Sequence, residues 1–265
     1  MNARTRLQVI LSDLHVLSTV GLWPPRYKAH EGHIILQNVF QELLWQHWKE
    51  CQEWIARICG EDHFELILNG DLVDGIHHKT TQVMSADQND QIGAVLEVLG
   101  PLAEKAAKIY LTKGTESHTR NDECYIGREL GAVQDPATGH HAWDRLELKL
   151  PTGKIFSASH HMPATKRVYL EASMMSIELQ NEIMERVRCN KTPPDIVARA
   201  HRHTHGIYSN GRQMFMVTGA WQGLTRYGRK VVPHAIPSAS CIILDSRNKK
   251  TNELPVANEK IFINE

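Results

Sequence analysis

The sequence lacks several features that would place it in a special class of protein. Its 30 Lys and Arg residues balance 30 Asp and Glu residues, so its overall charge does not require a nucleic acid, a membrane surface or an acidic partner. Its five cysteines include no Cys-x-x-Cys pair, which argues against a disulfide framework or a thiolate zinc site and favours a reducing, cytoplasmic compartment. No segment approaches the roughly 20 apolar residues that a membrane span needs.

The chain is nevertheless long and apolar enough to bury a full core. Its 265 residues, 42% of them hydrophobic, fit one large domain better than two. We see no internal repeat, low-complexity tract or linker in the sequence. We therefore expect residues 1–265 to form a single domain that does not associate with membranes.

The order of the predicted elements favours an α/β fold. Residues 7–11 and 66–68 are typical of buried strands, and residues 34–58 and 86–108 have the apolar spacing of helices, the second of which Gly100-Pro101 could interrupt. This alternation implies parallel strand pairing. Later patterns predict a hairpin at 146–159, a helix at 168–188, and strands at 109–111, 195–200, 214–218 and 238–244. We expect two packed mixed β-sheets flanked by helices.

Sixteen histidines are the unusual feature of the composition, because imidazole is a common ligand of transition metals and the usual acid or base near neutral pH. Five successive strand ends deliver ligand-type residues: Asp13 and His15, Asp71, the loop 114–118, His160 and His161, and His201 and His203. Open α/β sheets bind ligands at the carboxyl ends of their strands. Mixed Asp and His ligands suit Mn, Fe, Zn or Ni.

Each motif also has a simpler interpretation. Residues 13–15 alone would more often form a solvated turn that caps a helix. Gly70 permits a tight turn that brings the Asp71 carboxylate to the same edge, whereas Asp74 fits a supporting position or an Asx turn equally well. A polar loop rich in histidine is the alternative for residues 200–205. We prefer a surface or core role for His30, His33, His47, His63, His77, His78, His140, His141 and His234.

The order Asp-x-His, Gly-Asp-x-x-Asp, Gly-x-x-x-His, His-His and His-x-His resembles the calcineurin-like metallophosphoesterase superfamily, over the stretch from Asp13 to His203. The resemblance implies an α/β/β/α sandwich that holds two divalent metal ions, with Asp71 as a bridge. The ligands it implies are Asp13, His15, Asp71 and His203 for one ion and Asp71, His160 and His201 for the other. Ala200 stands where the family has glycine, and His205 offers a competing register in which it pairs with His203; we favour His201 and His203 for their distance from the strand.

The third motif departs from the family pattern. The family usually has Gly-Asn-His followed by an acid, whereas residues 113–119 read KGTESHT, which is similar to loops of the phage and prophage branch. Either Thr115 replaces the asparagine as a weaker hydroxyl ligand, or a longer loop lets His118 supply an imidazole. The second ion would then be held less tightly than the first.

The resemblance implies a phosphoesterase in which two cations lower the pKa of a shared water and clamp the phosphate. Phosphodiesters, including nucleic acids and nucleotides, are the expected substrates, and phosphomonoesters or a weakly catalytic scaffold are the alternatives. His118 is the expected general acid, and Arg202 and Arg120 could contact phosphate oxygens. Residues 221–230 mix aromatic and basic side chains, which suits either a nucleic-acid strand or an ordinary surface hairpin.

Overall fold

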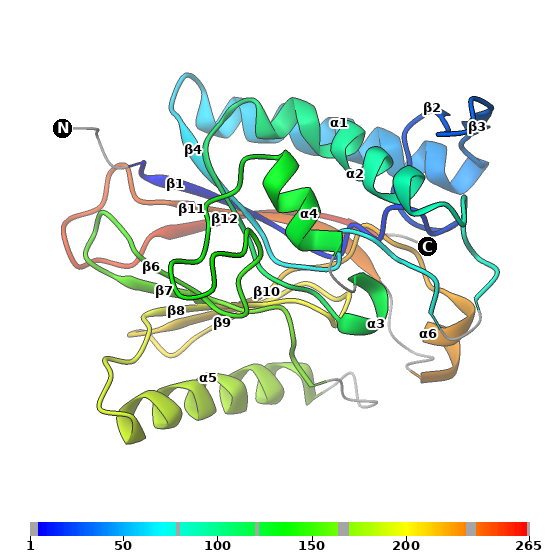
Figure 1. The fold of residues 1–265 in the computed structure, drawn as a ribbon. Helices are drawn as coiled ribbons and strands as arrows, with labels where there is room; N and C mark the ends of the chain where they lie inside the picture. Colours follow the sequence, from blue (N-terminus) through cyan, green and yellow to red (C-terminus); the bar gives the residue numbers. More distant parts are fainter. Residues whose placement is uncertain (1–4, 78–79, 120–121, 164–169, 232–236, 264–265) are drawn as a thin grey trace.

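The first sheet is built around β1 (Leu7–Leu11), whose five residues are all buried. In the computed structural model, which describes residues 5–77, 80–119, 122–163, 170–231 and 237–263, its strand order is β12-β11-β1-β4-β5 (Figure 1). The strands β4 (Phe64–Leu68) and β5 (Ala106–Leu111) run parallel to β1, as predicted. Antiparallel pairing adds β11 (Ser238–Asp245) and then β12 (Val256–Ile263), of which β12 was not predicted.

The second sheet has the strand order β6-β7-β8-β10-β9. The predicted hairpin is confirmed as β6 (Leu146–Lys149) and β7 (Ile155–Ala158), and the predicted strands at 195–200 and 214–218 as β8 (Ile196–Arg199) and β10 (Met214–Val217). β9 (Gly206–Ser209) pairs antiparallel with β10 and was not predicted. Two mixed sheets are therefore present, as expected.

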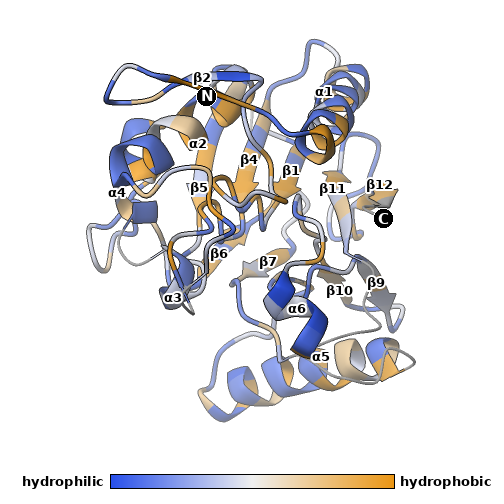
Figure 2. Cartoon of the chain, turned by 90° about the vertical axis from the view of Figure 1, so that its right-hand side faces the viewer, coloured by the Kyte–Doolittle hydropathy of each residue, from blue (hydrophilic) through white to orange (hydrophobic). Residues whose placement is uncertain are grey.

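Helices cover the outer face of each sheet (Figures 1 and 2). The first sheet is covered by α1 (Val39–Cys59), α2 (Gln88–Ala103) and α4 (Asp122–Glu129), and the second by α5 (Glu171–Arg188). Two shorter helices, α3 (Glu116–Thr119) and α6 (Arg226–Val231), lie among the loops. No helix in the described ranges is long and apolar enough to cross a lipid bilayer. The predicted arrangement of two sheets between helices is confirmed.

The start of α1 differs from the predicted range 34–58. Residues Ile34–Leu36 form β3, which pairs with β2 (Arg26–Lys28). The helix begins only after Asn38, whose side chain accepts the backbone N–H of Gln41 at 3.0 Å while the Gln41 side chain accepts the Asn38 N–H at 3.1 Å. This capping box satisfies two backbone donors at that point. In α2, by contrast, Pro101 does not break the helix, which continues to Ala103.

Apolar side chains between the two sheets align their strand ends. Ile10 and Ile67 of the first sheet belong to one buried cluster with Phe156, Ile196 and Met216 of the second. Full burial of such a side chain contributes roughly 1.5–3 kcal/mol. The carboxyl ends of β1, β4, β7 and β8 consequently open on the same side of the molecule.

Candidate metal centre

The loops that follow β1 and β4 are joined by backbone hydrogen bonds. The Asp13 N–H donates to the carbonyl of Gly70 at 2.9 Å, and the His15 N–H donates to the carbonyl of Asp71 at 3.1 Å. These bonds continue the parallel pairing of the two strands into their loops. The first two sequence motifs are therefore held side by side by the main chain itself.

One group of ligand-type side chains consists of Asp13, His15 and His203. The two Nε2 atoms of the histidines lie 3.1 Å apart, and they lie 3.7 Å (His15) and 3.5 Å (His203) from Oδ1 of Asp13. Atoms that share one cation at bond lengths of about 2.1 Å stand roughly 3.0–3.5 Å apart. This group therefore has close to the separation that one metal ion requires.

A second group consists of Asp71, His160 and His201. Asp71 Oδ2 lies 2.9 Å from His160 Nε2 and accepts the Thr115 hydroxyl at 3.1 Å, and that hydroxyl lies 3.1 Å from His201 Nδ1. The sequence left Thr115 and His118 as alternatives for the missing asparagine, and Thr115 is the one beside this group. His160 Nε2 also lies 3.9 Å from Asp13 Oδ1, so the two groups adjoin.

The backbone is strained at these residues. Positive φ angles occur at Asp13 (50°), His15 (43°), Asp71 (52°), His201 (70°) and His203 (60°). Only three other non-glycine residues in the described ranges have a positive φ. Such conformations cost of order 1 kcal/mol each and persist where surrounding structure enforces them, most often at functional sites. Their concentration here supports both groups as the candidate centre independently of the side-chain distances.

Asp74 organises the outer side of the first group. Its Oδ1 lies 3.0 Å from His15 Nδ1 and 3.4 Å from both His118 Nδ1 and His77 Nε2. Burial opposes its ionisation, but hydrogen bonds to His118, His15 and His77 hold the pKa of Asp74 well below its usual range. A carboxylate on one imidazole nitrogen directs the other nitrogen toward a metal. Sequence reasoning gave His77 a surface or core role and missed this contact.

The four histidines of the two ligand groups divide into two with raised pKa values and two with lowered pKa values. Although burial disfavours their charged forms, the nearby carboxylates of Asp13 and Asp74 raise the pKa of His15 to about 10, and the charges of Asp71 and Asp13 raise the pKa of His160 to about 10. Burial, followed by the charge of His160 or His15 respectively, lowers the pKa of His201 and of His203 to about 4.

Both carboxylates in the two groups stay ionised. Burial opposes this, but neighbouring His160 and His15 keep the pKa of Asp13 below its ordinary value, and His160 does the same for Asp71. Two carboxylates and two neutral imidazoles are thus ready to act as ligands, while His15 and His160 would release protons first.

Glu123 is a buried residue of the centre that the sequence did not reveal. Its carboxylate accepts the Leu72 N–H at 3.1 Å and the Gly114 N–H at 2.5 Å, so it ties together the loops that carry Asp71 and Thr115. Burial and then the charge of Asp71 raise the pKa of Glu123 to about 7. The loops also approach closely, since a Cβ on Gly114 would lie 2.3 Å from Asp71 Oδ1. In the sequence, Glu123 was marked only by its acidic side chain, in a stretch for which no helix was predicted.

The remaining predicted residues lie in different surroundings. His118 lies beside the first group, with its ring centroid 5.0 Å from that of His15. His205 contacts Glu259, and its Nδ1 lies 3.2 Å from Ser240 Oγ. It therefore does not take the ligand position that the alternative pairing with His203 would require. Arg202 is nearly buried and pairs with Glu171 of α5 at 3.0 Å. Arg120 lies outside the described residues.

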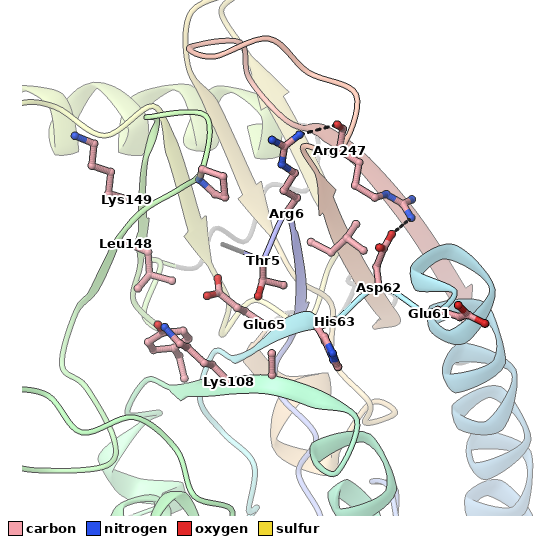
Figure 3. A pocket seen from close by; sticks show the side chains of 14 residues that line it. Thr5, Arg6, Glu61, Asp62, His63, Glu65, Lys108, Leu148, Lys149 and Arg247 are labelled. Carbon is pink, nitrogen blue, oxygen red and sulfur yellow. Dashed lines mark hydrogen bonds and ion pairs between the residues drawn. The ribbon is translucent and has the colours of Figure 1, made fainter. Parts of the chain in front are cut away.

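Two cavities flank the sheets at opposite ends. A cleft of about 820 Å³ adjoins the second ligand group and is lined by Lys113, Thr115, Arg145, His160 and His161, among others. A cavity of about 760 Å³ lies at the amino ends of β1, β4 and β5, where its charged side chains include Arg6, Glu65, Lys108 and Arg247 (Figure 3). In that cavity Arg247 pairs with Asp62 at 2.9 Å. Only the first cleft therefore reaches the ligand groups.

Solved structures with a related arrangement are distant from this chain. An archaeal phosphodiesterase has a TM-score of 0.45 at 10% identity, covering 97% of this chain and 99% of that one. Vps29 from Entamoeba histolytica, complexed with Zn²⁺, has a TM-score of 0.39 at 10% identity, covering 98% of this chain and 99% of that one. A conserved uncharacterized protein of Streptococcus pneumoniae TIGR4, described as a predicted phosphoesterase, has a TM-score of 0.37 at 14% identity, covering 99% of each chain. No family model and no curated protein matches the chain. These likenesses establish neither a family nor an activity.

Proposed function

We propose that this chain is a metal-dependent phosphoesterase of the calcineurin-like type that hydrolyses phosphodiesters. The proposal depends on one observation: two adjoining Asp and His groups, Asp13, His15 and His203 with Asp71, His160 and His201, meet on strained backbone at the carboxyl ends of the strands. Two adjoining groups of mixed oxygen and nitrogen donors are what a two-metal phosphoesterase requires.

The side chains fit divalent cations in a second respect. Asp13 Oδ1 is buried and has no hydrogen-bond partner in the described part of the chain, since the Nε2 atoms of His203 and His15 lie 3.5 and 3.7 Å away. A buried polar atom without a partner is costly, and a cation in the first group would satisfy this one. Asp13, His15 and His203 would hold one ion. Asp71, His160 and His201 would hold the other, with Asp71 as the proposed bridge and Thr115 as a weak hydroxyl ligand. The cations would be Mn, Fe, Zn or Ni.

Bound cations would supply Lewis acidity and an activated water for attack at phosphorus. The protein side chains supply orientation and proton transfer. His118 Nδ1 is 2.9 Å from the Asp74 carbonyl oxygen, which fixes the ring and leaves Nε2 on the opposite side. From there His118 would donate a proton to the leaving oxygen. Asp74 therefore positions both a metal ligand, His15, and the proposed general acid.

The cleft has room for an organic group of the proposed diester substrate. A phosphodiester carries an organic group on each side of phosphorus, whereas a monoester carries one. The cleft of about 820 Å³ beside Thr115 and His160 lies within the roughly 300–1,000 Å³ of small-molecule sites. It offers room for one of the two groups next to the second ligand group.

Hydrolysis of chromogenic esters tests the proposal. After removal of metal with EDTA and readdition of Mn²⁺, the protein should hydrolyse bis-p-nitrophenyl phosphate faster than p-nitrophenyl phosphate. Activity on the monoester alone would identify a phosphomonoesterase of the same architecture. Bound metal without activity on either ester would identify a scaffold and refute the proposal.

A further inference from the structure

The short helix α6 carries three cations and no acidic residue. Arg226, Arg229 and Lys230 are all exposed, and their spacing of i, i+3 and i+4 places them on one helix face. Like charges at this spacing destabilise a helix. None of the ion pairs formed within the described part of the chain neutralises them. An anionic ligand bound to this face would relieve the repulsion among the three cations.

The segment before α6 is attached to the metal centre. The Trp221 N–H donates to the Asp13 carbonyl at 2.8 Å, and Gln222 Nε2 donates to Asp74 Oδ1 at 3.1 Å. A chain advances at most about 3.6 Å per residue, so the start of α6 lies within about 14 Å of Gln222. The Arg226 N–H is also held by Gln82 Oε1 at 3.0 Å. The start of the cationic helix is thus tethered within about 14 Å of Gln222, which contacts the Asp74 carboxylate beside the first ligand group.

The second ligand group is bordered by different chemistry. In the cleft, Lys113 pairs with Asp144 at 2.9 Å, and Arg145 pairs with Glu185 at 3.4 Å. The cleft is consequently polar without a marked excess of either charge. Figure 2 shows α6 as a hydrophilic helix in front of the strand ends, on the side toward which the loops of the centre open. A substrate that reached both features would be anionic over α6 and polar in the cleft.

We infer that α6 binds the phosphate backbone of a single-stranded nucleic acid whose scissile phosphate lies at the two ligand groups. This inference rests on the proposed phosphodiesterase function and specifies its substrate class. Tyr227, a residue that is 50% exposed, follows Arg226 in the sequence. Aromatic rings that stack on bases beside cations that follow the backbone are typical of single-strand binding. The strand continues from α6 across the centre toward the cleft.

Binding measured without metal separates this inference from hydrolysis. The probe is a fluorescein-labelled oligothymidylate of roughly 16 nucleotides, followed by fluorescence anisotropy in EDTA across a salt series. Each phosphate contact on a single strand contributes about 0.7 to the slope of log affinity against log salt. The variant R226Q/R229Q/K230Q should therefore lose about 2 from the slope, and roughly 100-fold in affinity near 0.1 M salt.

Matched variants decide between specific and general charge effects. K49Q/R57Q/K105Q removes the same charge from exposed positions on or next to the outer helices and should change affinity by less than about 2-fold. Tyr227→Ala should weaken binding by at least about 5-fold, whereas Tyr227→Phe, which keeps the stacking ring, should not. Equal losses in the two triple variants would overturn the inference, as would duplex binding that is tighter than single-strand binding and insensitive to Tyr227→Ala. If the oligonucleotide binds as expected but wild-type protein hydrolyses no diester, the proposed function fails and the binding surface stands.

Discussion

Removal of the Glu123 carboxylate should destabilise the two loops that carry Asp71 and Thr115. Glu123 accepts the buried N–H of Leu72 at 3.1 Å and the partly buried N–H of Gly114 at 2.5 Å, and Glu123→Ala leaves both donors without this acceptor. Each unsatisfied buried donor costs about 1–3 kcal/mol, which gives a loss of about 2–6 kcal/mol. Glu123→Gln keeps one acceptor oxygen and should lose about half as much. At roughly 2–4 °C per kcal/mol for a chain of this size, the alanine variant should melt at least about 4 °C lower.

The pH dependence of this loss has a definite sign. Burial and the charge of Asp71 raise the pKa of Glu123 from 4.5 to about 7. The protonated form is therefore favoured in the folded state, and the stability that Glu123 contributes is lost as pH rises from about 4.5 to about 7. Melting temperatures of wild type and Glu123→Ala should differ more near pH 5.5 than near pH 8.

The control is Glu129→Ala on the same helix, where the side chain is 40% exposed and pairs with Arg128. Exposed ion pairs contribute little, so this variant should stay within about 0.5 kcal/mol of wild type. Glu123→Ala should also weaken Mn²⁺ binding by about 10–100-fold, since it supports the loops of two proposed ligands. A Glu123→Ala protein with the melting temperature and metal affinity of wild type would refute the reasoning.

Three further predictions concern the proposed ligands and acid. Asp71→Asn should lose most diester hydrolysis and at least one metal ion by elemental analysis, and a fully loaded, active variant would contradict its assignment as a ligand. His118→Ala should lower turnover by about 10²–10⁴ while keeping its tightly bound metal; complete metal loss would instead identify a ligand. Because the pKa values of His15 and His160 are raised to about 10, metal binding at pH 7 should release about two protons, so affinity should rise with pH. Calorimetry in buffers of different ionisation enthalpy would count the released protons, and zero release would contradict the protonated state assigned to His15 and His160.

Local sequence was sufficient for the elements that have a strong apolar pattern. The strands at 7–11, 146–149 and 214–217 appear close to where their patterns place them, because residue alternation or continuous burial determines which face packs. The start of α1 was misplaced since the apolar spacing of residues 34–36 fits a helix as well as a strand. Only the capping box at Asn38, together with the pairing of β2 and β3, decided between them.

The sequence by itself determined which residue types follow the strands, and therefore the chemistry available at that edge. Asp13, Asp71 and the paired histidines could be named because a strand end and a ligand-type residue are both local features. What only the tertiary structure decided is which of them face one another. Glu123 and Asp74 act across loops far apart in the chain, and no spacing rule connects a residue in α4 to the N–H of Leu72 or Asp74 to His15. Such contacts arise when packed sheets bring separate loops together, so they become visible only once the fold is known.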